Sequence, residues 1–488
     1  MARQGGLNSV GSMFNQALRF GITFLLALLL GPSGAGLYYQ SFAFLAFLSL
    51  VASGGSTLTL TRYVAVHRAD RDDGALRGTL RLGLITPTLI ATVIGIGLYL
   101  LAPWLAQVAF NDPRLVTLLR LVALALPATA YTDAALSATQ GFKTMRPYAL
   151  INLFFEPACR VLLTVALLWV GWGLTGVMIA LVVTNFASAV LASVALRRLL
   201  GKLTTPPQYN VKEIFAFSAF SWFTKIAGNG LIWADTILLG IYATAADVGV
   251  YTVATRLTLL ATVFVDPVTT SFSPRIADLW RRERYQTLSK TYKLVTSWVF
   301  RLSLPSFIVL LLFPTELLSI FGRSFGTGAT VTVIMTSAWL LNCLSGPSGY
   351  MLTMSGRVKA QMATSAGGLV LNVALNLWLI PSRGIIGAAI AWGASLVIIT
   401  MVRVAQVWAF SRMFPLSRDL LKGVLAGLAA AAAGLLIRTA TGGGLDSLIA
   451  GAVAIGAVYV AGLWMLGLDD DDRLVLHTLR RRLPLGSR

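Results

Sequence analysis

Long apolar stretches alternate with short polar gaps along almost the whole chain. Each stretch is about as long as the roughly 20 residues that a helix needs to cross a bilayer. The pattern predicts about fourteen membrane-spanning helices, over residues 10–30, 37–58, 80–102, 115–137, 148–170, 174–196, 214–240, 248–270, 293–313, 328–348, 361–380, 386–409, 419–437 and 445–467.

The basic residues of the gaps predict the orientation. Of the 39 Arg and Lys residues, 28 lie in every second gap and at both ends, 4 lie in the other gaps, and 7 fall inside apolar stretches. Because cytoplasmic loops of membrane proteins carry such an excess, we expect both termini in the cytoplasm and an even number of helices. The opposite gaps are short, the longest at 103–114 and 314–328, so an external catalytic domain has no room.

Composition indicates a protein that is mostly embedded. The chain is 56% hydrophobic and 12% charged, with a mean hydropathy of +0.77, whereas soluble domains carry about 25% charged residues. The net charge of +20 is dispersed over many gaps, which suits topology and anionic lipids rather than nucleic acid. His67 and His477 have no metal-ligand spacing, and no G-x-x-x-x-G-K-[ST] loop occurs. We expect no metal, no cofactor and no enzyme activity.

Short motifs repeat at a distance of 209 to 213 residues. Leu29-Leu30-Gly31 and Gly36-Leu37-Tyr38 return as Leu238-Leu239-Gly240 and Gly249-Val250-Tyr251, and Gly173-Leu174-Thr175-Gly176 returns as Gly384-Ile385-Ile386-Gly387. The offsets predict a duplicated six-helix block, inserted the same way up in both copies, with a substrate path between them. The predicted parts are two six-helix bundles at 1–200 and 201–415, an extra helix pair at 416–468 and a cytoplasmic tail at 469–488.

Several ionisable side chains lie inside or beside the apolar stretches, where each costs about 2.5–3.5 kcal/mol and tends to face a cavity or a partner. Arg19 belongs to the first predicted helix, Lys225 and Asp235 to the seventh, and Arg256 to the eighth. One interpretation is a basic cavity for an anionic headgroup, since guanidinium groups suit phosphate oxygens. The other is that Asp235 pairs with Arg256 and that Arg19 reaches the cytoplasmic surface. Arg62, at the predicted end of the second helix, is either a topology anchor or a contact for the headgroup.

A second set of polar residues includes an acid and a base on one helix. Glu156 and Arg160 are spaced to meet on one face, and Pro157 leaves a carbonyl unpaired and bends the helix. The pair either couples transport to an ion or is a structural pair at a kink. Asp133 and Asp266 lie near predicted helix ends, where an aspartate more often caps or kinks a helix than takes part in transport. Amides either join helices or line a cavity for sugars, and the sequence does not sort them: Gln140, Asn152, Asn185, Asn229, Asn342, Asn372 and Asn376.

An ordered set of motifs covers nearly the full length: Arg19-Phe20, Leu30-Gly31-Pro32 with Gly36-Leu37-Tyr38, Arg62-Tyr63-Val64-Ala65, Glu156-Pro157 with Arg160, Asp235 with Leu239-Gly240, Val248-Gly249-Val250-Tyr251 with Ala254 and Arg256, and Pro274-Arg275-Ile276-Ala277. Together they resemble the bacterial polysaccharide-export flippases of the multidrug/oligosaccharidyl-lipid/polysaccharide exporter superfamily.

The resemblance implies an all-α membrane protein with two six-helix bundles in a V and two extra helices. It implies flipping of an undecaprenyl-pyrophosphate-linked oligosaccharide, an O-antigen or exopolysaccharide repeat unit, to the outer leaflet of the bacterial cytoplasmic membrane by alternating access. It implies a basic cavity for the headgroup, which fits Arg19, Lys225 and Arg256. Expected partners are this lipid, membrane lipids, H⁺ or Na⁺, and other polysaccharide-assembly proteins. Glu156, Asp235 and Asp266 are the candidate coupling groups.

Three other functions stay open on the residues. Lipid II flippases share the implied fold and use cavity arginines, but their typical Arg-Asp pair late in the first helix is Arg19-Phe20 here. Cation-coupled multidrug exporters usually have twelve helices and acidic sites, which the extra helix pair and the basic cavity argue against. Polysaccharide polymerases and ligases typically carry a long external loop, and the predicted gaps contain none.

Overall fold

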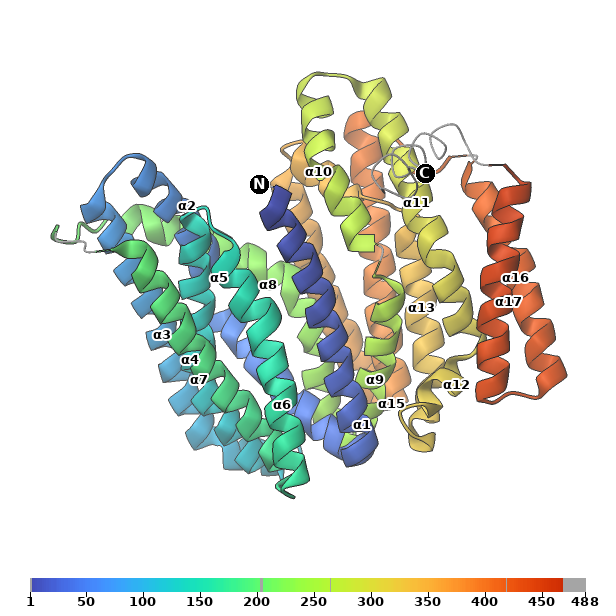
Figure 1. Ribbon diagram of the computed structural model, residues 1–488, viewed down its shortest axis with the longest axis horizontal. Coiled ribbons are helices and arrows are strands. Elements are labelled where there is room, and N and C mark those ends of the chain that lie inside the picture. Colours follow the sequence, from blue (N-terminus) through green and yellow to red (C-terminus); the bar gives the residue numbers. More distant parts are fainter. Residues whose placement is uncertain (1, 202–204, 264, 418, 468–488) are drawn as a thin grey trace, which may run out of the picture. The chain divides into compact units, whose positions relative to one another are not determined.

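The computed structural model describes residues 2–201, 205–263, 265–417 and 419–467, and within them the side chains of 2–10, 231 and 266 are not described. These parts are helical with short turns, and no strand occurs in them (Figure 1). Apolar helices satisfy their own backbone hydrogen bonds, which is what a bilayer without water requires. The predicted tail at 469–488 lies outside the described residues.

The helices of the first half are α1 (Ala2–Ala52), α2 (Ser56–Ala69), α3 (Asp73–Trp104), α4 (Leu115–Gly141), α5 (Arg146–Tyr148), α6 (Glu156–Trp169), α7 (Gly173–Leu200) and α8 (Val211–Tyr242). Two π-helical segments, η1 (Leu105–Ala109) and η2 (Ala149–Phe155), extend α3 and join α5 to α6.

The second half contains α9 (Ala245–Ala261), α10 (Val265–Arg281), α11 (Tyr285–Leu312), α12 (Pro314–Ser319), α13 (Ala329–Cys343), α14 (Ser348–Met354), α15 (Val358–Ser411), α16 (Asp419–Thr441) and α17 (Leu445–Met465). A short 3₁₀ segment, η3 (Arg323–Gly328), precedes α13.

The fold class predicted from the sequence is confirmed: the protein is all-α, with about fourteen membrane helices. Ten helices of the described chain are long and apolar enough to cross a bilayer. Two of them, α1 and α15, each contain two predicted spans joined at a kink, where Gly31 and Gly384 have φ values of 66° and 53°. Two further predicted spans correspond to α8 and to α9.

Some predicted boundaries are wrong. The span at 37–58 ends earlier, because Gly54 and Gly55 adopt left-handed φ values after Ala52 and a separate α2 follows. The span at 248–270 is divided between α9 and α10, and the helix of the span at 328–348, α13, already ends at Cys343. Apolar composition continues across these breaks, so hydropathy alone does not reveal them.

The chain divides into two compact units. Unit 1 comprises residues 1–253 and 365–391, and unit 2 comprises 254–364 and 392–488. In unit 1, α4 packs against α3 and α7, around buried Leu119, Leu126 and Met178. Unit 1 includes α8 and parts of α9 and α15, which lie beyond residue 200. The bundle boundaries at 200 and 415 stay a prediction.

Unit 2 is organised around α11. Its side chains Tyr292 and Phe307 are completely buried, and the C-terminal pair α16 and α17, side by side in Figure 1, packs against it. Gly427 makes room for Leu304, since a Cβ there would lie 2.6 Å from Leu304 Cδ2. The Tyr459 hydroxyl donates to the backbone carbonyl of Arg301 at 2.9 Å. The extra helix pair is therefore an integral part of unit 2.

A reciprocal contact in unit 1 joins glycines from the two predicted repeats. A Cβ on Gly36 would lie 1.7 Å from the carbonyl oxygen of Ala245, and one on Gly249 would lie 2.0 Å from the carbonyl oxygen of Pro32. Each glycine thus faces the carbonyl four residues before the other glycine. Backbones approach this closely only where side chains are absent. The reciprocity is that of a local two-fold axis between α1 and α9, which supports the duplication.

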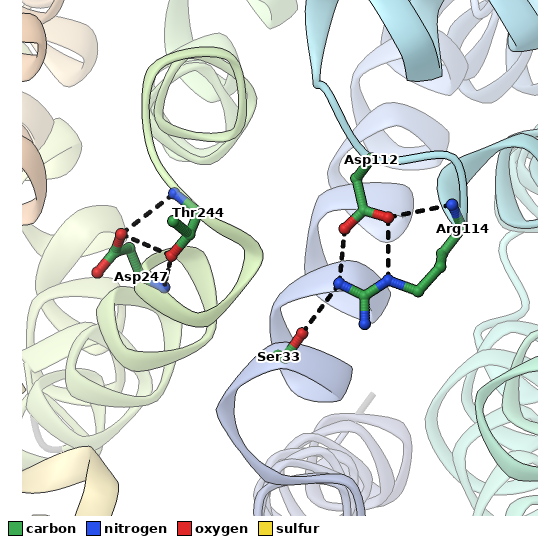
Figure 2. Close-up of polar contacts among 5 residues, drawn as sticks. All are labelled: Ser33, Asp112, Arg114, Thr244 and Asp247. Atoms are coloured by element: carbon green, nitrogen blue, oxygen red, sulfur yellow. Dashed lines mark hydrogen bonds and ion pairs between the residues drawn. The ribbon is translucent and has the colours of Figure 1, made fainter.

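We call the close approach of Pro32–Gly36 to Ala245–Gly249 the glycine crossing. Residues within or next to these two segments form the polar contacts drawn in Figure 2. Arg114 donates to both carboxylate oxygens of Asp112, from Nε at 2.9 Å and from Nη2 at 2.7 Å, and also to the Ser33 hydroxyl at 3.3 Å. The Arg114 guanidinium lowers the pKa of Asp112 below its usual range. At the start of α9, the Asp247 carboxylate accepts from the Thr244 N–H, and the Asp247 N–H donates to the Thr244 hydroxyl, which is a capping box.

Candidate functional site

Unit 1 contains a cavity of about 300 Å³ among its helices, lined by residues of α1, α4, η2, α6, α7 and α8. This volume is at the lower end of the range for small-molecule sites. Five ionisable side chains line it, three cations and two carboxylates: Arg19, Lys225, Arg160, Asp133 and Glu156. Because isolated charges inside a bilayer are expensive, their convergence on one space marks a candidate binding site.

A local distortion of the backbone positions the acidic and basic pair. In a π-helix each carbonyl accepts a hydrogen bond from the N–H five residues later. For Asn152 in the π-helical segment η2 that residue is Pro157, which has no N–H to donate. Asn15 of α1 donates to that carbonyl instead, at 3.0 Å. The proline therefore links α1 to η2 and places Glu156 at the first turn of α6, facing the cavity.

Glu156 and Arg160 form an ion pair through Oε1 and Nη2. Their side chains are 12% and 7% exposed, and the Arg160 guanidinium lies 5.6 Å from the ring centre of Phe42. The second oxygen of Glu156 and the Nε of Arg160 have no hydrogen-bond partner. Each partner thus keeps one unpaired atom, and both residues line the cavity.

Arg19 and Lys225 complete the cationic part of the lining. Arg19, in the first half of α1, keeps an exposed side chain. Lys225 of α8 is half-buried, and its Nζ lies 3.4 Å from the Thr57 hydroxyl. Asp133 also lines the cavity, because α4 continues to Gly141 and places it inside the helix rather than near its end. The expectation that Asp133 caps a helix is wrong.

The structure places five of the seven amides that the sequence left unassigned. Asn152, Asn185 and Asn229 line the cavity, whereas Asn372 and Asn376 lie in α15 beside Asp235. Sequence reasoning missed further lining residues, among them Phe42, Ser188 and Trp233. The spacing of Asn185 and Ser188 on one helix face was a usable signal. Phe42 and Trp233, whose ring centres lie 5.4 Å apart, left no such signal in the sequence because they lie on different helices.

Asp235 belongs to a separate polar cluster in unit 1, in which both oxygens of its carboxylate are paired. Its side chain is buried, with 3% of the residue exposed. One carboxylate oxygen accepts from the Tyr251 hydroxyl at 3.0 Å, and the other accepts from Asn376 Nδ2 at 2.6 Å. Asn376 Nδ2 also donates to the backbone carbonyl of Asn372 at 2.9 Å. Asp235 is absent from the cavity lining, so the cavity and this cluster are distinct features.

The other predicted site residues lie elsewhere. Arg62 is in the middle of α2 rather than at a helix end, and its guanidinium lies 4.6 Å from the ring centre of Phe217. Packing against α8 therefore occupies it, and it does not line the cavity. Arg256 lies in the part of α9 that belongs to unit 2 and is half-buried. The side chain of Asp266 lies outside the described residues.

Two family models match the chain. The model for "Polysaccharide biosynthesis protein" matches residues 1–280, which includes every residue that lines the cavity. The model named MatE matches residues 221–378.

Two relatives are similar to most of the chain. The chain is 25% identical over 409 residues to the "Probable low-salt glycan biosynthesis flippase Agl15" of Haloferax volcanii, with 82% of each chain covered. It is 23% identical over 437 residues to "Stage V sporulation protein B" of Bacillus subtilis, covering 83% of this chain and 82% of the relative.

Solved structures share the fold. An inward closed conformation of the lipid II flippase MurJ matches with a TM-score of 0.77 at 14% identity, covering 94% of this chain and 98% of the other. An inward-facing multidrug resistance transporter of the MATE family matches with a TM-score of 0.66 at 14% identity, covering 82% and 97%.

Proposed function

Because the chain belongs to the polysaccharide biosynthesis protein family, we propose that it is a flippase for lipid-linked oligosaccharides. The cargo is an undecaprenyl-pyrophosphate-linked repeat unit of an O-antigen or exopolysaccharide. It moves from the inner to the outer leaflet of the cytoplasmic membrane by alternating access, with the lipid tail in the bilayer and only the headgroup crossing the protein. The protein forms and breaks no covalent bond of the cargo.

The cavity in unit 1 is the observation that supports this proposal most. Arg19 and Lys225 supply positive charge for the phosphates, and Asn185 and Asn229 supply amides for sugar hydroxyls. Trp233 adds an aromatic surface, a common partner for the apolar face of a sugar. A pocket that combines all three suits a charged glycan headgroup better than a hydrophobic organic cation.

The remaining predicted residues keep proposed roles outside this lining. Arg256 supplies a second-repeat contact to the headgroup, and Arg62 meets the headgroup as it enters from the cytoplasm. Glu156, Asp235 and Asp266 are the candidate groups that couple transport to H⁺ or Na⁺. Among them Asp235 has the most complete set of partners, so a change in its protonation or occupancy would alter contacts between α8, α9 and α15.

A lipid II flippase is the second candidate function. The chain shares its fold with the MurJ structure over 94% of its length. At 14% identity that likeness shows the fold alone. Lipid II also carries a pyrophosphate and sugars, so both cargoes suit the same cavity chemistry, and only a transport assay separates them.

The test is translocation in proteoliposomes. The purified protein is reconstituted with a labelled undecaprenyl-pyrophosphate oligosaccharide or with labelled lipid II, and protection of the label from an impermeant reagent is followed. We expect transport of the oligosaccharide by the native chain, and at least a tenfold loss in Arg19→Ala and Lys225→Ala.

Arg120→Ala is the matched control, since Arg120 is an intramembrane arginine that stacks on Tyr99 and does not line the cavity. Transport of lipid II at the same rate as the oligosaccharide would favour the second candidate function, a lipid II flippase. Export of small organic cations without transport of either lipid would overturn both.

A further inference from the structure

The Glu156–Arg160 pair uses one atom from each partner. A guanidinium and a carboxylate commonly meet through two parallel hydrogen bonds. Here Arg160 Nη2 contacts Glu156 Oε1, while Arg160 Nε and Glu156 Oε2 are buried and unpaired. Unpaired buried polar atoms cost folding free energy and call for an explanation. A structural pair at a kink does not by itself explain why each partner keeps a buried atom without a hydrogen bond.

The surroundings of the pair indicate what the unused atoms are for. Ser49 and Ser188 line the same cavity, are 8% and 2% exposed, and have hydroxyl groups without a partner. Four unpaired polar atoms, from α1, α6 and α7, therefore surround one space of about 300 Å³. An arginine Nε and two hydroxyls are donors that a phosphate group satisfies with its oxygens.

We propose that Glu156–Arg160 is a displaceable ion pair, in which phosphate oxygens of the headgroup replace Glu156 on Arg160. Glu156 holds the guanidinium in position while the cavity is empty and competes with the incoming anion. On binding, Arg160 turns its fork to the phosphate, and the released carboxylate stays in a cavity whose other cations, Arg19 and Lys225, balance it. This inference rests on the proposed function and adds Arg160 to its binding residues.

The chain contains a matched control pair. Glu316 of α12 and Arg438 of α16 approach to 3.6 Å, and Glu316 is 8% exposed with an unpaired Oε2. Neither residue lines the cavity, and the Arg438 side chain is 37% exposed. In each of the two pairs the glutamate has one buried oxygen without a hydrogen bond. The pairs differ in that only Glu156 and Arg160 line the cavity.

The experiment measures binding of farnesyl pyrophosphate to the purified full-length protein in detergent by calorimetry, with farnesol as the uncharged reference. We expect Arg160→Lys to weaken binding about tenfold or more, because an ammonium cannot reproduce the fork. We expect Glu156→Gln to tighten binding severalfold, because the anionic competitor is gone. Glu316→Gln and Arg438→Lys leave the affinity unchanged.

The diagnostic result is that Arg160→Lys weakens the binding of farnesyl pyrophosphate while Glu156→Gln tightens it. A purely structural pair would move both variants in the same direction, or neither, and that would overturn the proposal. If Arg160→Lys does not fold, the double variant Glu156→Gln/Arg160→Lys, which leaves no unpaired carboxylate, must bind more weakly than Glu156→Gln alone.

The two proposals fail in different ways. Native protein that binds farnesyl pyrophosphate and flips lipid-linked sugar, but shows no opposite effects, loses the displaceable pair and keeps the flippase. Native protein that binds farnesyl pyrophosphate no better than farnesol and transports no lipid-linked sugar loses the proposed function itself.

Discussion

Two regions of unit 1 use polar and small residues in opposite ways. At the glycine crossing, backbone meets backbone with no space between, and both oxygens of the neighbouring Asp112 carboxylate are bonded to Arg114. Around the cavity, Glu156, Arg160, Ser49 and Ser188 each keep an unpaired atom beside open volume. Saturated contacts make a region rigid and stable, whereas unpaired groups next to a cavity hold bonding capacity for a ligand.

The crossing should be the most sensitive site to a single methyl group. Gly249→Ala places a Cβ 2.0 Å from the Pro32 carbonyl oxygen, and backbone atoms cannot yield as a side chain does. We expect a loss of about 3 kcal/mol in the free energy of unfolding, seen as a lower melting temperature in detergent.

Gly97→Ala is the control for this change. Gly97 lies in α3, where a Cβ would meet no atom within 4 Å. There the substitution should stabilise the protein by roughly 0.5–1 kcal/mol, because alanine is the better helix former. Equal melting temperatures for the two variants would show that the crossing is not tightly packed in the membrane.

A saturated carboxylate should matter more for stability than a half-satisfied one. The two carboxylate oxygens of Asp235 accept hydrogen bonds from Tyr251 and Asn376. In Asp235→Asn the new NH₂ group would face one of these donors, and that hydrogen bond would be lost. We expect a loss of about 1–3 kcal/mol. Glu156→Gln keeps an acceptor for Arg160 and should cost less. Chemical denaturation of both variants in the same detergent makes the comparison, and a larger loss for Glu156→Gln would reverse it.

Ser188 should separate stability from function. Its hydroxyl is buried without a partner, so Ser188→Ala removes an unsatisfied group and should leave the melting temperature unchanged or slightly raised, by up to about 1 kcal/mol in free energy. The same change should lower transport of the lipid-linked oligosaccharide several-fold if the hydroxyl contacts the headgroup. A variant that is less stable and fully active would refute this assignment.

The smallest effect is expected at the exposed pair beside the crossing. Arg114 lowers the pKa of Asp112 in the folded state, so the pair stabilises the protein above the unfolded pKa of about 4 and loses this contribution as the pH falls through the folded value. Because the Arg114 side chain is 62% exposed, we expect less than about 1 kcal/mol. Asp112→Asn should lower the melting temperature slightly at pH 7 and less at pH 3.

The amino-acid sequence was sufficient for the features that repeat along the chain. Apolar length predicted the membrane helices, and motif offsets predicted a duplication that the reciprocal contact of Gly36 and Gly249 supports. The sequence also selected Arg19 and Lys225, since a charge inside an apolar run must find a polar space wherever the helix packs.

The same reasoning could not assign partners across helices. The sequence left Arg62 as a topology anchor or a headgroup contact and gave no sign that it stacks on Phe217 of α8. Asp133 looked like a cap because the predicted helix ended too early. Phe42 and Trp233 form one wall of the cavity although 191 positions separate them in the sequence, a distance over which no local pattern carries information.

The sequence by itself therefore determined that this protein is a duplicated bundle of membrane helices with a few buried charges, because hydropathy and charge act residue by residue. Only the tertiary structure decided which charges share a cavity, which amide faces it and which atoms stay unpaired. Those outcomes depend on helix rotation and on local breaks such as η2 and the glycine kinks, where a shift of one residue turns a side chain by about 100° around the helix axis.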